Sequence, residues 1–219
     1  MDGGARSGIA LELFRNPQFL SILVARILTD PVWFFYVNWE PSFLQDQLGF
    51  SFSSLAHLGW IPTAAAAAAI FAIGALSDRF VVRRNWSPAR SRRVMIQSVS
   101  VLAPSLAIVP FVHSPVAAIL LLSLARSMMA VWLNFSNLLA ADLLPLGRIG
   151  TAVSLISAGG GAAGLAVMLL VGHWVQRFGY TPIFVAGACL HPLAAVLLWT
   201  RAKKNAGLVA EPRANPYFA

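Results

Sequence analysis

The chain has 219 residues, of which 58% are hydrophobic and only 11% are charged, and its mean hydropathy is +0.72. Because a soluble domain averages about 25% charged residues, this composition excludes an ordinary soluble fold and indicates an integral membrane protein. A net charge of +8 is also found in nucleic-acid-binding proteins, but these carry their basic residues on a soluble fold, so we expect no nucleic acid partner. The single cysteine, Cys189, excludes an intrachain disulfide.

Six apolar segments long enough to cross a lipid bilayer follow a short N-terminal region. Residues 1–16 are predicted to be a cytoplasmic lead-in that ends at Asn16 and Pro17, since proline suits the first turn of the helix that follows. We expect no secretory signal there, because Glu12 and Arg15 interrupt the apolar core that such a signal needs. We predict transmembrane helices over residues 17–45, 55–76, 94–112, 116–141, 149–175 and 182–200, and a cytoplasmic tail over 201–219. The predicted fold is therefore an all-α membrane protein with six transmembrane helices.

The first predicted helix carries charges where the bilayer is most apolar. Arg26 and Asp30 are one helical turn apart and near the middle of the span, so they should face protein or a water-filled cavity. Pro31 removes one backbone hydrogen bond, and we expect the helix to kink or open beside the pair, as helices do at the solute sites of carriers. Two interpretations stay open: an internal ion pair that neutralises a buried helix, or a group that binds ligand or couples its transport.

Other polar residues inside the spans have weaker claims. Arg126, in the fourth helix, resembles Arg26 in its position inside an apolar segment. Glu40 is expected near the outer mouth as a solvated carboxylate. For His191, packing is the ordinary explanation and a proton relay is the alternative. Small residues at 64–69 and at 159–164 predict helices that approach one another closely.

The basic residues indicate how the chain lies in the membrane. With six spans, one side receives two basic residues in 1–16, six in 77–93, one in 142–148 and four in 201–219, whereas the other side receives Arg177 alone. Basic loops stay in the cytoplasm, so we expect both termini on the cytoplasmic side of the cell membrane. The positive net charge is then a signal of topology.

A short internal repeat divides the six spans into two sets of three. Gly74–Phe80 ends the second predicted helix, and Gly172–Phe178, which has glycine, arginine and phenylalanine at the same places, ends the fifth. An odd number of spans separates the two copies, which places them on opposite sides of the membrane. This arrangement is typical of inverted three-plus-three repeats in transporters.

The predicted loop at 77–93 and the helix before it carry a motif with a family resemblance. Gly74, Asp78, Arg79, Arg83 and Arg84 resemble the loop signature of the major facilitator superfamily, between the second and third spans of a six-helix unit. The resemblance implies a conformational latch, in which an acidic residue and arginines at helix ends lock neighbouring helices in one conformation and release them in the other.

A narrower resemblance is to the anion:cation symporter branch, which includes hexuronate and related sugar-acid transporters. It is carried by residues 28–36 with Trp39 and Pro41, by 85–87 with Arg90, Arg92 and Arg93, and by Trp132 ten residues before 142–145. Members have twelve spans, and the motif order here matches their C-terminal half. The resemblance therefore implies a missing N-terminal six-helix half, which in such relatives holds the main proton-coupling carboxylates and a key arginine for the substrate.

The same resemblance implies a substrate cavity lined by polar residues of the spans. Its candidate residues are Arg26, Asp30, Tyr36, Asn38, Arg126, Trp132, Asn134, Asn137 and Ser157. For Trp132, packing is the ordinary alternative. Relatives commonly have asparagine where this chain has Phe135 and Ser157.

These observations predict the C-terminal half of a secondary transporter that moves small organic anions such as sugar acids by alternating access, coupled to protons. A non-transporting fragment, a membrane subunit or scaffold that needs a partner half, and an efflux antiporter remain alternatives. We expect no enzyme, because the chain has no Gly-x-Ser-x-Gly, His-Glu-x-x-His or Walker motif, and we expect no cofactor or metal.

Overall fold

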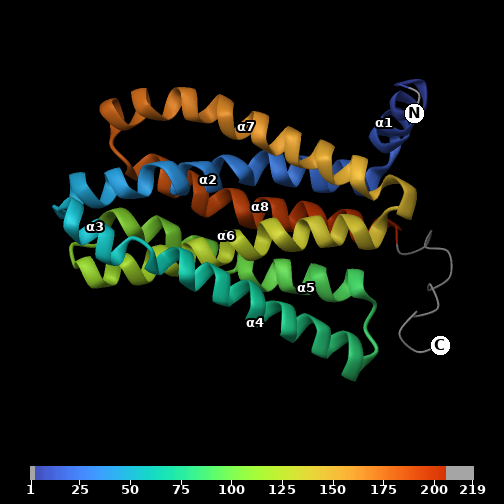
Figure 1. Ribbon diagram of the computed structural model, residues 1–219, viewed down its shortest axis with the longest axis horizontal. Helices are drawn as coiled ribbons and strands as arrows, with labels where there is room; N and C mark the ends of the chain where they lie inside the picture. Colours follow the sequence, from blue (N-terminus) through green and yellow to red (C-terminus); the bar gives the residue numbers. More distant parts are fainter. Residues whose placement is uncertain (1–2, 206–219) are drawn as a thin grey trace.

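The computed structural model describes the backbone of residues 3–205 and the side chains of residues 8–200. Within these ranges the chain is helical and has no strand, and the helices pack as one bundle (Figure 1). The elements are α1 (Gly3–Arg15), α2 (Pro17–Leu48), α3 (Phe52–Leu58), α4 (Ile61–Arg84), α5 (Pro88–Ser100), η1 (Ala103–Phe111), α6 (Pro115–Leu143), η2 (Leu146–Arg148), α7 (Ile149–Phe178) and α8 (Thr181–Asn205). Most of the predicted tail, residues 206–219, lies outside the described residues.

Six helical units are long and apolar enough to cross a membrane. They are Pro17–Leu48, Phe52–Arg84, Pro88–Phe111, Pro115–Leu143, Leu146–Phe178 and Thr181–Thr200. The predicted all-α, six-span fold is confirmed, and the protein is a multi-pass membrane protein. Several helices extend a few residues beyond the predicted ranges. Helix α2, for example, starts at the predicted residue, where Asn16 accepts hydrogen bonds from the N–H groups of Gln18 and Phe19, but it continues to Leu48, where Gly49 ends it in the left-handed conformation.

The arginine-rich loop predicted at 77–93 is much shorter in the structure. Helix α4 continues to Arg84, and α5 starts at Pro88, so the turn is only residues 85–87. Asn85 ends α4 in the left-handed conformation at φ 50°, and Ser87 caps α5 by accepting from the N–H of Arg90. The arginines therefore lie on the ends of two helices instead of in a loop.

Helix α2 does not open at Pro31. It remains one α-helix from Pro17 to Leu48, with Pro31 and Pro41 inside it. The expectation that the helix opens beside the ion pair is wrong, because one proline removes only one backbone donor and α2 is held by α6, α7 and α8 around it. Spans are interrupted instead at Gly59 and Trp60, between α3 and α4, and at Val101 and Leu102, between α5 and η1.

The packing follows the inverted repeat. The most extensive contacts pair α2 with α7 and α6 with α4. Since α2 and α6 are the first spans of the two repeats and α4 and α7 are the second, these two pairs are equivalent. In Figure 1, α2 and α6 run through the middle of the bundle, flanked by α7 on one side and α4 on the other. The most apolar stretches of α2 and α6 are each 56% buried, whereas those of α4 and α7 are 11% and 22% buried.

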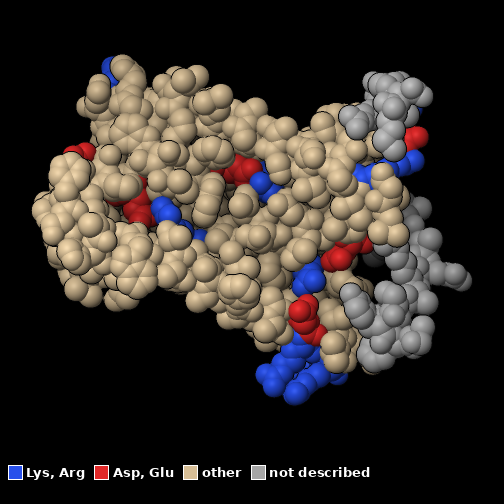
Figure 2. Space-filling view, in the orientation of Figure 1, with Lys and Arg blue, Asp and Glu red and all other residues tan. Residues whose placement is uncertain are grey.

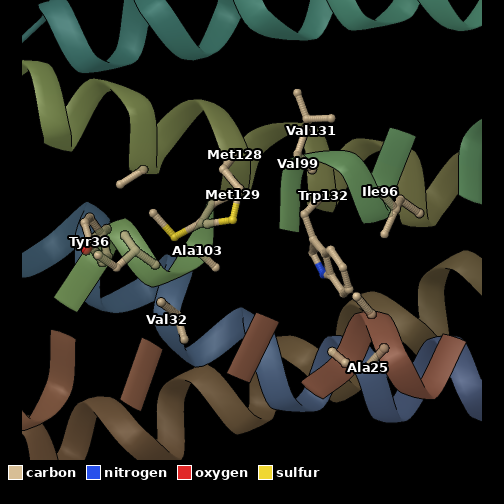
Figure 3. Packing of buried hydrophobic residues seen from close by; sticks show 14 of the residues in the cluster. Ala25, Val32, Tyr36, Ile96, Val99, Ala103, Met128, Met129, Val131 and Trp132 are labelled. Carbon is tan, nitrogen blue, oxygen red and sulfur yellow. The ribbon is translucent and has the colours of Figure 1, made fainter. Parts of the chain in front are cut away.

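Aromatic and sulfur-containing side chains fill the interior between α2, α6 and α8. Tyr36 packs edge-on against Phe35 and Phe184, with ring centroids 5.7 and 5.3 Å away. Figure 3 shows Met128 and Met129 between Tyr36 and Trp132 in this core. These contacts fix the two central helices, α2 and α6, which carry the buried charges.

Candidate functional site

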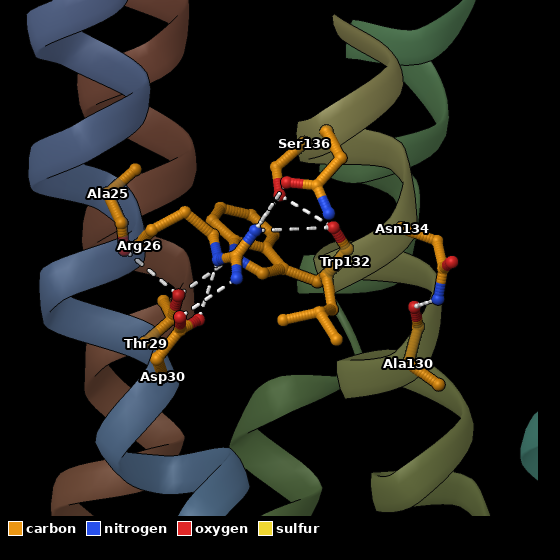
Figure 4. Close-up of polar contacts among 10 residues, drawn as sticks. Ala25, Arg26, Thr29, Asp30, Ala130, Trp132, Asn134 and Ser136 are labelled. Atoms are coloured by element: carbon orange, nitrogen blue, oxygen red, sulfur yellow. Dashed lines mark hydrogen bonds and ion pairs between the residues drawn. The ribbon is translucent and has the colours of Figure 1, made fainter. Parts of the chain in front are cut away.

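Arg26 and Asp30 form an ion pair in the middle of α2 (Figure 4). Nε of Arg26 donates to Oδ1 of Asp30 at 2.7 Å, and Nη2 donates to Oδ2 at 2.9 Å. Each of the two residues is only 3% exposed. The contact predicted from their spacing is present, and both parallel bonds that a guanidinium offers to a carboxylate go to Asp30.

The remaining bonds of Arg26 cross from α2 to α6. Nη1 donates to Oδ1 of Asn137 at 2.8 Å and to Oγ of Ser136 at 3.2 Å. The Leu133 carbonyl lies 3.5 Å from the same nitrogen. Arg26 therefore connects the two central helices, and a ligand carboxylate would have to compete with Asp30 for it.

A second layer of contacts supports this pair. The Trp132 indole N–H donates to Oγ1 of Thr29 at 2.9 Å, and Thr29 donates to the Ala25 carbonyl at 2.9 Å. His191 is 1% exposed and packs edge-on against Trp132, with ring centroids 5.4 Å apart. On the α7 side, Gly160 touches Asp30 so closely that a Cβ there would overlap the carboxylate.

A second buried pair joins Glu40 of α2 to Arg126 of α6. Nη2 of Arg126 lies 3.1 Å from Oε2 of Glu40. Nη1 donates to Oγ1 of Thr63 at 3.0 Å, and Nη2 donates to the Tyr36 carbonyl at 3.2 Å. Glu40 is only 4% exposed, so the expected solvated carboxylate at the outer mouth is wrong. The side chain is removed from solvent because Arg126 reaches it from another helix.

Both pairs lie toward one face of the bundle. Figure 2 views the face across which α7, α2, α6 and α4 run, and it shows acidic and basic atoms side by side among uncharged atoms between the ends of the bundle, and again at the end that carries the α4–α5 turn. Arg26–Asp30 and Arg126–Glu40 lie well inside their spans, away from the helix ends at which Arg92 meets Asp78 and Asp142. Charge inside apolar spans is costly and usually functional, so this face is the candidate site.

Residues 3–166 match the family model described as Major Facilitator Superfamily. The chain belongs to the Major Facilitator Superfamily.

Three relatives connect this chain to carriers of organic anions. It is 25% identical over 192 residues to a hexuronate transporter of Escherichia coli K12, covering 86% of this chain and 44% of the relative. It is 25% identical over 193 residues to a D-galactonate transporter of Escherichia coli, covering 85% and 44%. A probable sulfoacetate transporter of Cupriavidus necator is 30% identical over 160 residues, covering 71% and 36%. The chain thus spans less than half the length of the relatives it matches.

The other cavity candidates of this superfamily member do not all lie with the ion pairs. The Tyr36 ring is buried in the aromatic core, and only its carbonyl contacts Arg126, whereas Ser157 is exposed on α7. The exposed Asn38 and Asn134 donate to carbonyls of their own helices, those of Phe34 and Ala130. Figure 4 shows Asn134 on the side of α6 that points away from Arg26. Of the predicted asparagines, Asn137 therefore contacts the Arg26 pair directly.

The superfamily motif residues lie at the end of the bundle that carries the α4–α5 turn. Nη1 of Arg92 lies 3.3 Å from Oδ1 of Asp78, and its Nε lies 3.8 Å from Oδ2 of Asp142. Arg92 thus joins α5 to α4 and α6. Gly74 is half-buried on α4, and Arg79, Arg83 and Arg84 are exposed. Sequence reasoning placed Asp78 and Arg79 together in the latch without Arg92, and the structure gives Asp78 an ion pair with Arg92, because α5 starts earlier than predicted.

A polar contact at the opposite end of the bundle was not foreseen from the sequence. The Tyr180 hydroxyl, in the turn before α8, donates to Oδ2 of Asp46 near the end of α2 at 2.7 Å. Burial and the hydrogen bond to Asp46 raise the pKa of the Tyr180 phenol, so it stays a proton donor at neutral pH.

Proposed function

We propose that this chain forms one half of a secondary transporter that moves small organic anions, such as sugar acids, across the plasma membrane by alternating access. The observation that carries the proposal is the presence of two arginines, Arg26 and Arg126, with carboxylate partners inside apolar spans on one face of a superfamily bundle. An arginine within a membrane span is suited to hold an anionic solute. The names of the relatives support the same class of cargo.

The second half is expected to cover the face that carries the ion pairs. The chain spans 44% of the length of two relatives, which leaves room for another six-helix unit. Much of α4 and α7 is unburied within this chain, so both helices have surface left for a second bundle as well as for lipid. Carriers place their solute between two such units and rock them around it. We propose that both termini are cytoplasmic and that a proton accompanies the anion.

Uptake by proteoliposomes tests the proposal. Labelled D-galacturonate or D-galactonate should enter vesicles that contain this chain joined to the proposed N-terminal six-helix half. Vesicles with this polypeptide alone should show no uptake above empty vesicles. Uptake by the lone, monomeric chain would contradict the half-carrier, and a two-half protein that moves only neutral sugars would contradict the anionic cargo.

A further inference from the structure

The two buried ion pairs differ in how completely their polar atoms are bonded. In the Arg26 pair, both oxygens of Asp30 accept a well-formed hydrogen bond and Nη1 is used by α6. In the Arg126 pair, Glu40 holds the guanidinium through a single contact, Nη2 to Oε2 at 3.1 Å, in place of two parallel bonds. Nε of Arg126 and the Tyr36 hydroxyl are buried without a hydrogen-bond partner among the described residues.

Because of this difference, separating the two pairs to admit a ligand costs different amounts of free energy. A buried charged group that is fully hydrogen-bonded is costly to separate from its partner. A buried donor that has no partner already bears most of the desolvation penalty, and a ligand that satisfies it recovers that free energy. The Arg126 pair is therefore the one that can exchange its partner.

We propose that Arg126 binds the carboxylate of the transported anion, that Glu40 is the counter-ion which this carboxylate displaces, and that Arg26–Asp30 is a structural pair. The inference rests on the proposed function and identifies the binding group within it. Nε and Nη2 form the edge of a guanidinium that takes a carboxylate through two parallel bonds, as Arg26 does with Asp30. On Arg126 that edge holds only the single contact with Glu40 and the Tyr36 carbonyl.

The rest of the Arg126 side chain stays anchored during such an exchange. Thr63 of α4 holds Nη1 at 3.0 Å, and the Tyr36 carbonyl of α2 lies 3.2 Å from Nη2. The Trp33 ring centroid is 6.0 Å from Cζ. Contacts from two other helices thus fix the plane of the guanidinium, which is the preorganisation that a carboxylate site needs.

Charge balance then couples the anion to a proton. The groups packed around Glu40 are Arg126 from α6 and Tyr36 from its own helix. Beside this pair, Thr63 of α4 contacts Arg126, Gly172 of α7 lies against Trp39, and Phe184 of α8 packs on Tyr36, and none of these three neighbours ionises. A displaced, ionised Glu40 would be a buried charge without a partner, so it should take up one proton for each anion bound.

A matched pair of variants in the complete two-half carrier tests the inference. Glu40→Gln and Asp30→Asn each remove one buried carboxylate from an arginine. With D-galacturonate as the probe, Glu40→Gln should bind about tenfold more tightly or better, because the competing charge is gone. It should also lose the proton uptake that accompanies binding in weakly buffered solution. Asp30→Asn should bind no more tightly and should melt at a lower temperature, and Arg126→Met should lose binding.

The outcomes separate this inference from the proposed function. If the unaltered carrier binds no sugar acid, the proposed function fails and the inference falls with it. If the unaltered carrier binds D-galacturonate but Glu40→Gln binds equally or more weakly, the inference is overturned and the function stands. A gain in affinity in Asp30→Asn alone would assign the exchange to Arg26 and overturn it too. If Glu40→Gln does not fold, Glu40→Asp serves in its place. Its side chain is one methylene shorter, so the carboxylate lies farther from Arg126, and this variant must bind D-galacturonate more tightly.

Discussion

Arg26 and Asp30 depend on each other because both are removed from water inside a membrane span. The guanidinium has the carboxylate at 2.7 and 2.9 Å and the amide oxygen of Asn137 at 2.8 Å. A buried ion pair of this kind contributes little net stability compared with an apolar pair of the same size, but losing one partner strands the other. Its clearest role is to connect α2 and α6 in one register.

Replacing Arg26 by methionine should therefore harm folding before it harms binding. The variant leaves the Asp30 carboxylate buried without its cation, at a cost of about 3 to 5 kcal/mol, and the melting temperature in detergent should fall clearly. The double variant Arg26→Met with Asp30→Asn should recover most of that stability.

Anion affinity in the same double variant decides between the two interpretations of Arg26. If Arg26 is structural, the double variant in the complete carrier should bind sugar acids as the unaltered protein does. If Arg26 holds the substrate, affinity should stay weaker by about 2 to 5 kcal/mol, the range for truncating one partner of a buried charged pair.

Contacts between side chains of one helix were easier to predict than contacts between side chains of different helices. The i, i+4 spacing of Arg26 and Asp30 shows in the sequence that their side chains meet. Glu40 and Arg126 are 86 positions apart, so no local pattern links them. One signal was available. Helix α2 ends next to Gly49 and α6 starts at Pro115, on the same side of the bundle. Glu40 lies nine residues before Gly49, and Arg126 lies eleven residues after Pro115. At 1.5 Å per residue, both charges lie about 14 to 17 Å deep.

At the scale of helices, the approach of α7 to α2 depends on glycine. A Cβ at Gly160 would overlap the Asp30 carboxylate, and a Cβ at Gly164 would overlap the Phe34 ring. The neighbouring Gly161 has nothing within 4 Å of the same position. The glycine-rich segment was expected to allow close packing, and the structure shows which of its members do so.

Gly160→Ala and Gly161→Ala form a matched test of this contact. Both gain about 1 kcal/mol of helix propensity, but only the first places a methyl group against Asp30. Gly160→Ala should lower the melting temperature of the purified protein, because Asp30 must move away from Arg26 or α7 must shift. Gly161→Ala should leave the melting temperature unchanged or raise it. Equal melting temperatures for the two variants would show that the contact is not needed.

Helix number followed from hydropathy, whereas helix ends and interruptions did not. Apolar length fixes where a span must lie, so the six spans were predictable. The arginines around the α4–α5 turn looked like a loop because they are charged, but Ser87 and Asn85 place the helix ends among them. Pro31 looked like a break, and packing against three helices keeps α2 continuous.

At the scale of the whole molecule, polar contacts tie the helices together at both ends. Arg92 links α5 to Asp78 of α4 and Asp142 of α6 at one end, and Tyr180 links the α7–α8 turn to Asp46 of α2 at the other. The two aspartates of α2 and α6 hold equivalent places near the ends of the first spans of the two repeats. Such ties favour movement of the bundle as one rigid body against a second half.

The arrangement of the helix ends leads to the prediction about topology. In Figure 1, α1, the α4–α5 turn and the α6–α7 turn lie at one end of the bundle, and α3 lies at the other. Arginines gather at the first end, with Arg79, Arg83, Arg84 and Arg90 exposed there. Because basic segments are retained in the cytoplasm, this end should face inward. Gln47, at the exposed end of α2, should face outward.

Single cysteines test this orientation in intact cells. In a Cys189→Ser background, Gln47→Cys should react with a membrane-impermeant thiol reagent, and Asn85→Cys should react only after the cells are opened. A reporter enzyme that is active only in the cytoplasm should likewise be active when it is fused to the C-terminus. Labelling of Asn85→Cys in intact cells would contradict the predicted orientation, because it would place the Asp78–Arg92 contact on the outside. The positive-inside argument would then fail for a chain whose basic residues are thirteen on one side and one on the other.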